Sequence, residues 1–320
     1  MTFDHLYLCY TPQNYFKALF LAHEKYERGE SVRILALFLQ GREDLAFFRT
    51  EKVYWAEIEL RLHKNKYIRI LPADLSNPLS YLRKASRKIA GRLARTFRRR
   101  AELRALVDSV MDSGTLYLFL ESTYFSSHLL KHRKCTLIEE GLSAYKPYFS
   151  RIGRAARARY PGEHPSVSEV WLRYPERANK RVLPKVKPLV LDYERLPGQA
   201  RNILLKLFGL SDFVREPRSA IVVGQAWSQS VVGSQPMLVH YKKVVDWLSA
   251  QGYSVFVKPH PSEDPGPYQE MGGTLLNAKM PLELFALGTE PYAFDVALSF
   301  LESSLVGASH LAEVYECYLT

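Results

Sequence analysis

The chain has no long apolar run and few cysteines, and both absences exclude classes of protein. Its apolar stretches, such as 34–39 and 116–120, are of strand length and fall short of the roughly 18 residues that a helix needs to cross a bilayer. Three cysteines in 320 residues, none of them in a C-x-x-C arrangement, indicate reduced, mostly buried thiols. No basic residue precedes Asp4 and His5, as it would in a signal peptide, so we expect a cytoplasmic protein.

Three short signatures of nucleotide and metal binding are also missing. The sequence contains neither a G-x-x-x-x-G-K-[ST] loop nor a G-x-G-x-x-G turn. Its nearest approach to Asp-x-Asp is Asp192-Tyr193-Glu194, which lies in a stretch punctuated by prolines. These absences argue against a P-loop enzyme and against the dinucleotide-binding fingerprint.

The formal net charge of +11 is concentrated in one segment. Between Arg83 and Arg104, ten lysines and arginines stand against one glutamate, within a stretch, 81–110, whose apolar residues recur at helical spacing. Three interpretations stay open: arginine stems that cover a helix while their heads stay in water, docking onto an anionic membrane surface, and attraction of a polyanionic substrate. The stretch has few aromatic residues, so we expect no nucleic acid partner.

The chain is long enough for two domains, and strands alternate with helices along both halves. We predict strands at 5–10, 32–39, 67–71, 116–120, 135–138, 170–172, 220–224, 253–257, 274–276 and 296–300. We predict helices at 12–28, 123–131, 199–208, 236–250 and 282–287, and a last one from Ser303 toward Tyr315. The expected fold class is α/β with two Rossmann-like domains, 1–190 and 191–320, and the basic segment 81–110 belongs to the first.

Polar and turn-forming residues follow three predicted strands of the second half: Gly224 and Gln225, then Lys258, His260 and Pro261, and finally Ser303 and Ser304. Pro259 and Pro261 cannot donate to a sheet, so they hold His260 on a stiff turn. The serines stand where a helix is expected to begin, and free N–H groups there attract phosphate. Because parallel strands end at one edge, all three groups should face one ligand site. The structural alternatives are a surface His-Pro turn and a serine that only caps its helix.

In the first half, the predicted strand 135–138 runs directly into Glu139-Glu140-Gly141. Adjacent carboxylates repel each other, which raises at least one of their pKa values and makes the pair a candidate acid/base device. The structural alternative is a solvated turn. Glu283, near the start of the predicted helix 282–287, is a further carboxylate, and it could accept two ribose hydroxyls.

The order of these motifs resembles that of bacterial sialyltransferases, namely the lipooligosaccharide sialyltransferases and the capsule polysialyltransferases. Their acidic pair with glycine, His-Pro motif and serine pair are similar to Glu139-Glu140-Gly141, Lys258-Pro259-His260-Pro261 and Ser303-Ser304. Cys9-Tyr10-Thr11-Pro12-Gln13 looks like the opening strand and turn of the lipooligosaccharide group. The segment from Pro281 to Leu284 looks like the one that holds the nucleotide ribose.

The resemblance implies the GT-B type of glycosyltransferase, in which two Rossmann-like domains face a cleft. The donor would be CMP-sialic acid, held by the second domain, with no metal and no cofactor. The resemblance puts Thr11, Pro12 and Gln13 on the acceptor side. Around the nucleotide and its phosphate it puts Gly224, Gln225, Lys258, Pro261, Glu283, Ser303 and Ser304.

The implied reaction moves sialic acid to a hydroxyl of a cell-surface glycan, lipooligosaccharide or capsule. Glu139 or Glu140 would take the acceptor proton, and His260 would donate to the departing phosphate. Attack from the face opposite the nucleotide would invert the anomeric centre. Two alternatives remain: a CMP-Kdo or other nucleotide-sugar transferase of the same fold, and a non-catalytic protein that binds membranes or polyanions through 81–110. If the segment 81–110 docks onto a membrane, we expect a cytoplasmic protein at the surface of the inner membrane.

Overall fold

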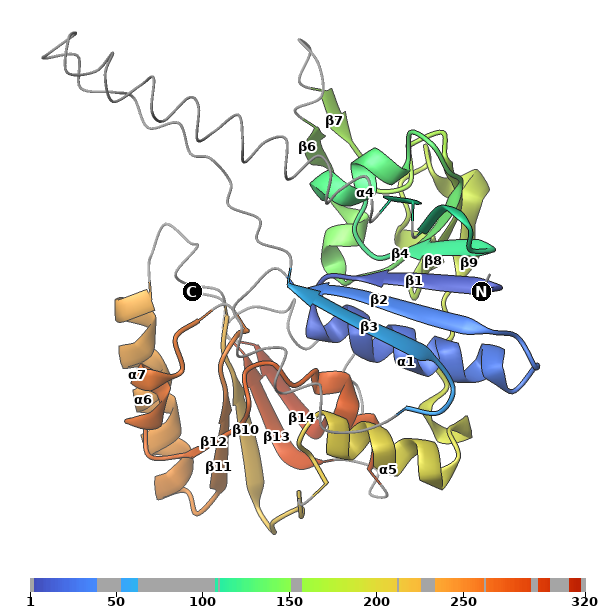
Figure 1. Cartoon of the computed structure of the whole chain (residues 1–320). Helices are drawn as coiled ribbons and strands as arrows, with labels where there is room; N and C mark the ends of the chain where they lie inside the picture. Colours follow the sequence, from blue (N-terminus) through green and yellow to red (C-terminus); the bar gives the residue numbers. More distant parts are fainter. Residues whose placement is uncertain are drawn as a thin grey trace, which may run out of the picture.

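The computed structural model describes residues 3–38, 53–62, 107–108, 110–150, 157–211, 213–225, 234–261, 263–288, 293–299 and 311–317. These residues build two parallel sheets with helices on their faces (Figure 1). The first sheet takes its strands from the chain up to Pro188, and the second takes them from Ser219 onward. The predicted division into domains at 190 and 191 stays a prediction.

The first sheet has the strand order β3-β2-β1-β4-β5-β8-β9. Its strands are β1 (His5–Cys9), β2 (Val32–Phe38), β3 (Glu57–Leu62), β4 (Thr115–Leu118), β5 (Cys135–Ile138), β8 (Val167–Leu172) and β9 (Val186–Pro188). Every pairing in it is parallel. The central order 3-2-1-4-5 is that of a Rossmann-like sheet, in which ligands bind where the order reverses, here between β1 and β4.

The second sheet repeats that order as β12-β11-β10-β13-β14. Its strands are β10 (Ser219–Val223), β11 (Ser254–Lys258), β12 (Thr274–Leu275), β13 (Phe294–Ser299) and β14 (Ala312–Cys317), again all parallel. Here the reversal lies between β10 and β13. Two sheets of this order confirm the predicted α/β class with two Rossmann-like halves.

The helices cover both faces of each sheet. The α-helices are α1 (Pro12–Tyr26), α4 (Tyr124–Leu129), α5 (Gly198–Leu207), α6 (Ser234–Ala250) and α7 (Gly266–Gln269). Short 3₁₀ helices are η1 (Leu142–Tyr145), η2 (Pro175–Arg177), η3 (Leu183–Lys185), η4 (Tyr193–Arg195) and η6 (Leu282–Leu287). An antiparallel pair, β6 (Tyr148–Ser150) and β7 (Arg157–Arg159), stands apart from both sheets.

The helix α1 begins as the sequence predicts. The Thr11 hydroxyl accepts a hydrogen bond from the Asn14 backbone N–H, and Pro12 occupies the first helical position. Gly29, with a φ of 78°, provides the left-handed turn that leads into β2. Every side chain from Asn14 to His23 is buried, so the middle of α1 has no solvent-facing side.

One apolar core joins the two halves. It runs from α1 through α5 to η6 and the second sheet, and Figure 1 shows α5 lying between α1 and that sheet. Phe16 of α1 meets Phe208, at the end of α5, edge to face with ring centroids 5.6 Å apart. Burying a phenylalanine contributes about 1.5–3 kcal/mol. The facing strand ends of both halves are therefore held together by a packed interface.

Some elements of the structure differ from the prediction. The helix predicted from Ser303 toward Tyr315 is wrong at its end, because Ala312–Cys317 form β14, an edge strand paired with β13. The strand Glu57–Leu62 was not predicted, although its alternation of charged and apolar residues is typical of a half-buried strand, and β3 is the edge of the first sheet. The strand predicted at 67–71 lies outside the described residues, as does the basic segment from 81 to 106.

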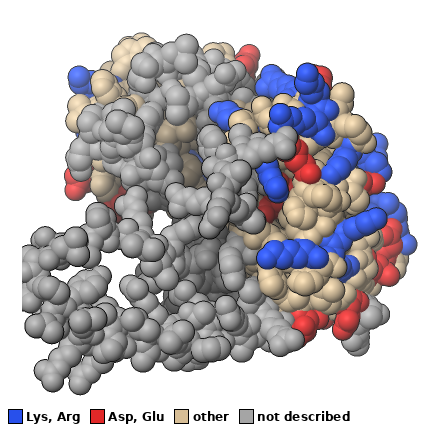
Figure 2. Space-filling view, turned by 90° about the horizontal axis from the view of Figure 1, so that it is seen from above, with Lys and Arg blue, Asp and Glu red and all other residues tan. Residues whose placement is uncertain are grey.

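Exposed lysines and arginines are also spread over the described surface of the first half (Figure 2). They include Lys131, Lys134, Arg177, Lys180, Arg181 and Lys187. Two of them have acidic partners, since Arg181 pairs with Glu163 and Lys187 with Glu169. Among the helices that the structure describes, none is both long and apolar enough to span a membrane.

Candidate active site

The ends of β10 and β11 fit closely together in the second half. The Gly224 N–H donates to the Lys258 carbonyl over 2.8 Å. A Cβ on Gly224 would lie 3.1 Å from both the His260 nitrogen and the Pro259 Cα. Glycine at this position therefore lets the Lys-Pro-His turn lie against the end of β10.

Gln225 bridges the reversal point of the second sheet. Its side-chain amide donates to the Ser299 hydroxyl over 3.2 Å, which links the end of β10 to the end of β13. Its backbone N–H donates to the Tyr241 hydroxyl of α6 over 3.1 Å. Gln225 is thus held at the place where ligands of Rossmann-like sheets bind. Ser303 and Ser304, which follow β13 in the sequence, lie outside the described residues.

Lys258 is buried beneath the turn. Its ammonium group donates to the Ala278 carbonyl over 3.1 Å. Burial lowers the pKa of Lys258 to about 8, although the nearby Glu283 carboxylate favours the charged form. Lys258 therefore links the turn to the segment at Ala278 and supplies positive charge close to His260.

His260 is half-buried at the tip of the same turn. Burial lowers the pKa of its imidazole, and the charges of Lys258 and Lys279 lower it further, while Glu263 opposes them. Lys279 also donates to the Pro261 carbonyl over 3.2 Å, so it holds the far side of the turn. The imidazole thus stands among positive charges, where an anionic group is favoured.

In the first half, Glu139 is fully engaged in hydrogen bonds. It directly follows β5 and is 3% exposed. Its carboxylate accepts from the Arg173 backbone N–H over 2.7 Å, from the Arg173 Nε over 3.1 Å and from the Tyr145 hydroxyl. Its carboxylate is therefore held in one orientation by donors from two residues.

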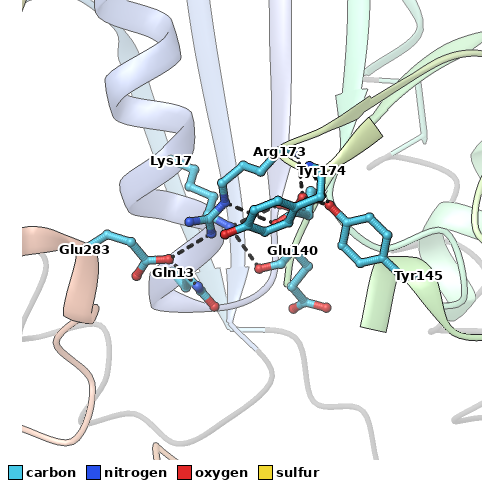
Figure 3. A network of polar contacts seen from close by, with 8 residues as sticks. Gln13, Lys17, Glu140, Tyr145, Arg173, Tyr174 and Glu283 are labelled. Carbon is cyan, nitrogen blue, oxygen red and sulfur yellow. Dashed lines mark hydrogen bonds and ion pairs between the residues drawn. The ribbon is translucent and has the colours of Figure 1, made fainter. Parts of the chain in front are cut away.

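Arg173 connects the two halves. It follows β8, and its Nη2 lies 3.3 Å from Glu283 Oε1 while its Nε bonds Glu139 (Figure 3). Gln13, at the start of α1, donates to the same Glu283 oxygen over 2.6 Å. Burial alone would raise the pKa of Glu283, but Lys17, Arg173 and Gln13 outweigh it and lower the pKa. The strand ends of the first half therefore reach a carboxylate of the second.

Glu140 differs from its neighbour. Its side chain points away from Arg173 (Figure 3), and burial raises the pKa of its carboxyl group to about 7, against opposing effects of Lys17 and Asn14. Its backbone carbonyl accepts from Lys17 over 2.9 Å. A carboxyl group with such a raised pKa is a candidate for acid or base chemistry.

The alpha-2,8-polysialyltransferase family (POLYST) matches residues 92–284, which is more than half of the chain. The chain belongs to this family. It is accordingly an enzyme, a glycosyltransferase. The matched region of this chain contains the acidic pair, the Lys-Pro-His-Pro turn and Glu283.

A search of curated protein sequences found no match. Similar solved structures include Glycyrrhiza uralensis UGT73P12 complexed with glycyrrhetinic acid 3-O-monoglucuronide, with a TM-score of 0.49 and 10% identity, over 99% of this chain and 77% of that one. A UDP-glucosyltransferase from Polygonum tinctorium capable of glucosylating indoxyl has a TM-score of 0.46 and 10% identity, over 99% and 80%. Two Rossmann-like halves in one chain are the GT-B arrangement that the sequence led us to expect.

The residues expected on the acceptor side all lie where β1 passes into α1. Thr11 caps the helix and Pro12 begins it, so both have a structural task. Gln13 is the one that reaches across to Glu283. The position after β1 is also the reversal point of the first sheet. The place of these residues on the acceptor side stays a prediction.

Three residues of this polysialyltransferase site were missed by sequence reasoning: Lys17, Tyr145 and Arg173. Arg173 directly follows the predicted strand 170–172, so the rule that singled out Glu139 would also have found it. Lys17 is a lone cation among the apolar residues of α1, which is a recognisable signal of a buried charge. Tyr145 carries no such signal, because only the turn through η1 brings its hydroxyl to Glu139.

Proposed function

We propose that this enzyme transfers sialic acid from CMP-sialic acid to a hydroxyl of a cell-surface glycan, with inversion of the anomeric centre. The observation that carries the proposal is the bridge from the acidic turn through Arg173 to Glu283. It joins the acidic motif to the half that holds the Lys-Pro-His-Pro turn, as a mechanism with groups on both sides of the sugar requires.

Glu140 is the proposed general base. Its pKa of about 7 suits removal of a proton from the acceptor hydroxyl at neutral pH. Glu139 is a poorer candidate, because its oxygens already accept from Arg173 and Tyr145. We assign Glu139 the task of holding Arg173 between the two halves.

His260 is the proposed acid, or hydrogen-bond donor, to the departing phosphate of CMP. A phosphate dianion beside the imidazole would raise its lowered pKa and so favour the protonated form. Ser303 and Ser304 are proposed as further donors to that phosphate, and Gly224, Gln225 and Pro261 as the frame of its site. A ribose bound to Glu283 would have to replace Gln13 or Arg173 as its hydrogen-bond donor.

The transfer is proposed to need neither a metal ion nor a cofactor, because Lys258 and Lys279 provide positive charge near the proposed phosphate site. We therefore expect an unchanged rate after treatment with EDTA. A rate that falls with EDTA and returns with added Mg²⁺ or Mn²⁺ would contradict this part of the proposal.

The donor is tested with the wild-type enzyme, a sialylated oligosaccharide acceptor and three labelled donors: CMP-sialic acid, CMP-Kdo and UDP-glucose. We expect a product only from CMP-sialic acid, with the anomeric configuration opposite to that of the donor by NMR. Transfer from CMP-Kdo alone would keep the fold and mechanism but change the donor, and transfer from UDP-glucose alone would overturn the proposal.

The location at the inner membrane surface also stays a proposal. It depends on the basic segment 81–110, and its test is cosedimentation with vesicles that contain anionic lipid. Binding that is lost at high salt would support it.

A further inference from the structure

Lys17 is a charged residue at a place where a charge is costly. It lies in the middle of α1 and is fully buried, with a relative exposure of 0%. Moving an ammonium group out of water disfavours its charged form, and burial lowers the pKa of Lys17 to about 8. The apolar core around α1 would be filled equally well by a methionine or leucine, so packing does not account for a lysine here.

The contacts of Lys17 go to the acidic turn. Its Nζ donates to the backbone carbonyl of Glu139 over 3.2 Å and to that of Glu140 over 2.9 Å (Figure 3). Both carbonyls lie just beyond the last residue of β5, where the pairing with β4 and β8 ends. One ammonium group therefore ties together the two peptide groups from which both carboxylates extend.

The charges that act on Lys17 come from other elements of both halves. They are Glu283 of η6, Arg173 after β8, and Glu139 and Glu140 after β5, with Glu283 having the largest effect among them. In return, Lys17 favours the ionised form of Glu140. Lys17 thus interacts both with Glu283 of the second half and with Glu140, the proposed base.

We infer that Lys17 is a positioning residue, which fixes the Glu139–Glu140 turn and keeps a positive charge beside the Glu140 carboxylate. The inference rests on the proposed role of Glu140 and goes beyond the known motifs, none of which contains this lysine. A lysine with a purely structural task would stabilise the turn without affecting the protonation of Glu140.

The experiment compares Lys17→Met, Lys17→Gln and Lys17→Arg with the wild type. Methionine removes both the hydrogen bonds and the charge, glutamine keeps a donor without charge, and arginine keeps the charge. The first readout is the pH dependence of kcat/KM for sialyl transfer. The second is the pKa of Glu140 itself, followed by carboxyl NMR of ¹³C-labelled glutamate and assigned with Glu140→Gln.

We expect the acidic limb and the NMR titration to move to higher pH, by on the order of one unit, in both neutral variants. In Lys17→Arg they should stay close to the wild-type position. Thermal unfolding identifies variants that fail to fold, and the glutamine variant tests the inference if methionine is not tolerated. Unchanged titration of Glu140 in a folded neutral variant would overturn the inference. The NMR readout needs no turnover, so a wild type that transfers no sialic acid would refute the proposed function separately.

Discussion

At the scale of single residues, two adjacent glutamates have opposite environments. The Glu139 carboxylate accepts hydrogen bonds from Arg173 and Tyr145, whereas burial raises the pKa of Glu140 to about 7. Folding therefore makes Glu140 bind its proton more tightly than it does in the unfolded chain. Its contribution lowers the free energy of unfolding as the pH rises from about 4.5 through 7.

Glu140→Gln should consequently stabilise the protein at pH 8 while reducing its activity. We expect a gain of about 1–3 kcal/mol in the free energy of unfolding at pH 8 and almost none at pH 4.5. Urea denaturation at both pH values measures it. Glu139→Gln is the matched control and should lose stability at pH 8, because Arg173 keeps its buried charge but loses an ionised partner. A Glu140→Gln protein less stable than the wild type at pH 8 would contradict the raised pKa.

The turn after β11 offers a second test at the residue scale. In Gly224→Ala, the added methyl would meet the backbone at Pro259 and His260, which cannot move aside as a side chain would. We expect the Lys-Pro-His turn to shift and kcat to fall at least tenfold, since displacement of a catalytic group by an ångström has large effects on rate. Gly198→Ala, where no atom lies within 4 Å of the added Cβ, is the control. Equal kcat values for the two variants would show that the close approach is unimportant.

At the scale of elements, the carboxyl ends of β5 and β8 and the start of α1 meet the start of η6 through a few polar side chains. Arg173 is shared by Glu139 and Glu283, whose side chains are 3% and 8% exposed. Removing one partner from such a group leaves a buried charge without compensation, at a cost of about 3–5 kcal/mol. The contact is thus a fixed connection between halves that otherwise meet through apolar packing.

A double-mutant cycle tests that connection. Arg173→Met should destabilise the protein strongly, and Arg173→Met combined with Glu283→Gln should cost less than the sum of the single changes. We expect a coupling energy of about 1–3 kcal/mol from urea denaturation. Arg181→Met with Glu163→Gln, a pair exposed by 50% and 15%, is the control, with an expected coupling below about 1 kcal/mol. If the two changes in the free energy of unfolding are additive, Arg173 and Glu283 do not connect the two halves energetically.

At the scale of the whole molecule, the sequence predicts the alternation of strands and helices that becomes two Rossmann-like halves. The rule that polar residues at strand ends share one edge brought Gly224, Gln225 and the Lys-Pro-His turn together correctly. Strand order and partner choice depend on contacts distant in the chain. For that reason the link from Gln13 and Arg173 to Glu283, residues more than 100 positions apart, could not be deduced from spacing.

The central claim is that a base in the first half and an acid in the second act on one donor sugar. Its most direct test is the kcat for sialyl transfer from CMP-sialic acid by Glu140→Gln, His260→Ala and Glu139→Gln, each shown to be folded by circular dichroism. We predict that Glu140→Gln and His260→Ala each lose about a hundredfold to ten-thousandfold in kcat, and that Glu139→Gln loses less. Wild-type turnover by both Glu140→Gln and His260→Ala would contradict the account.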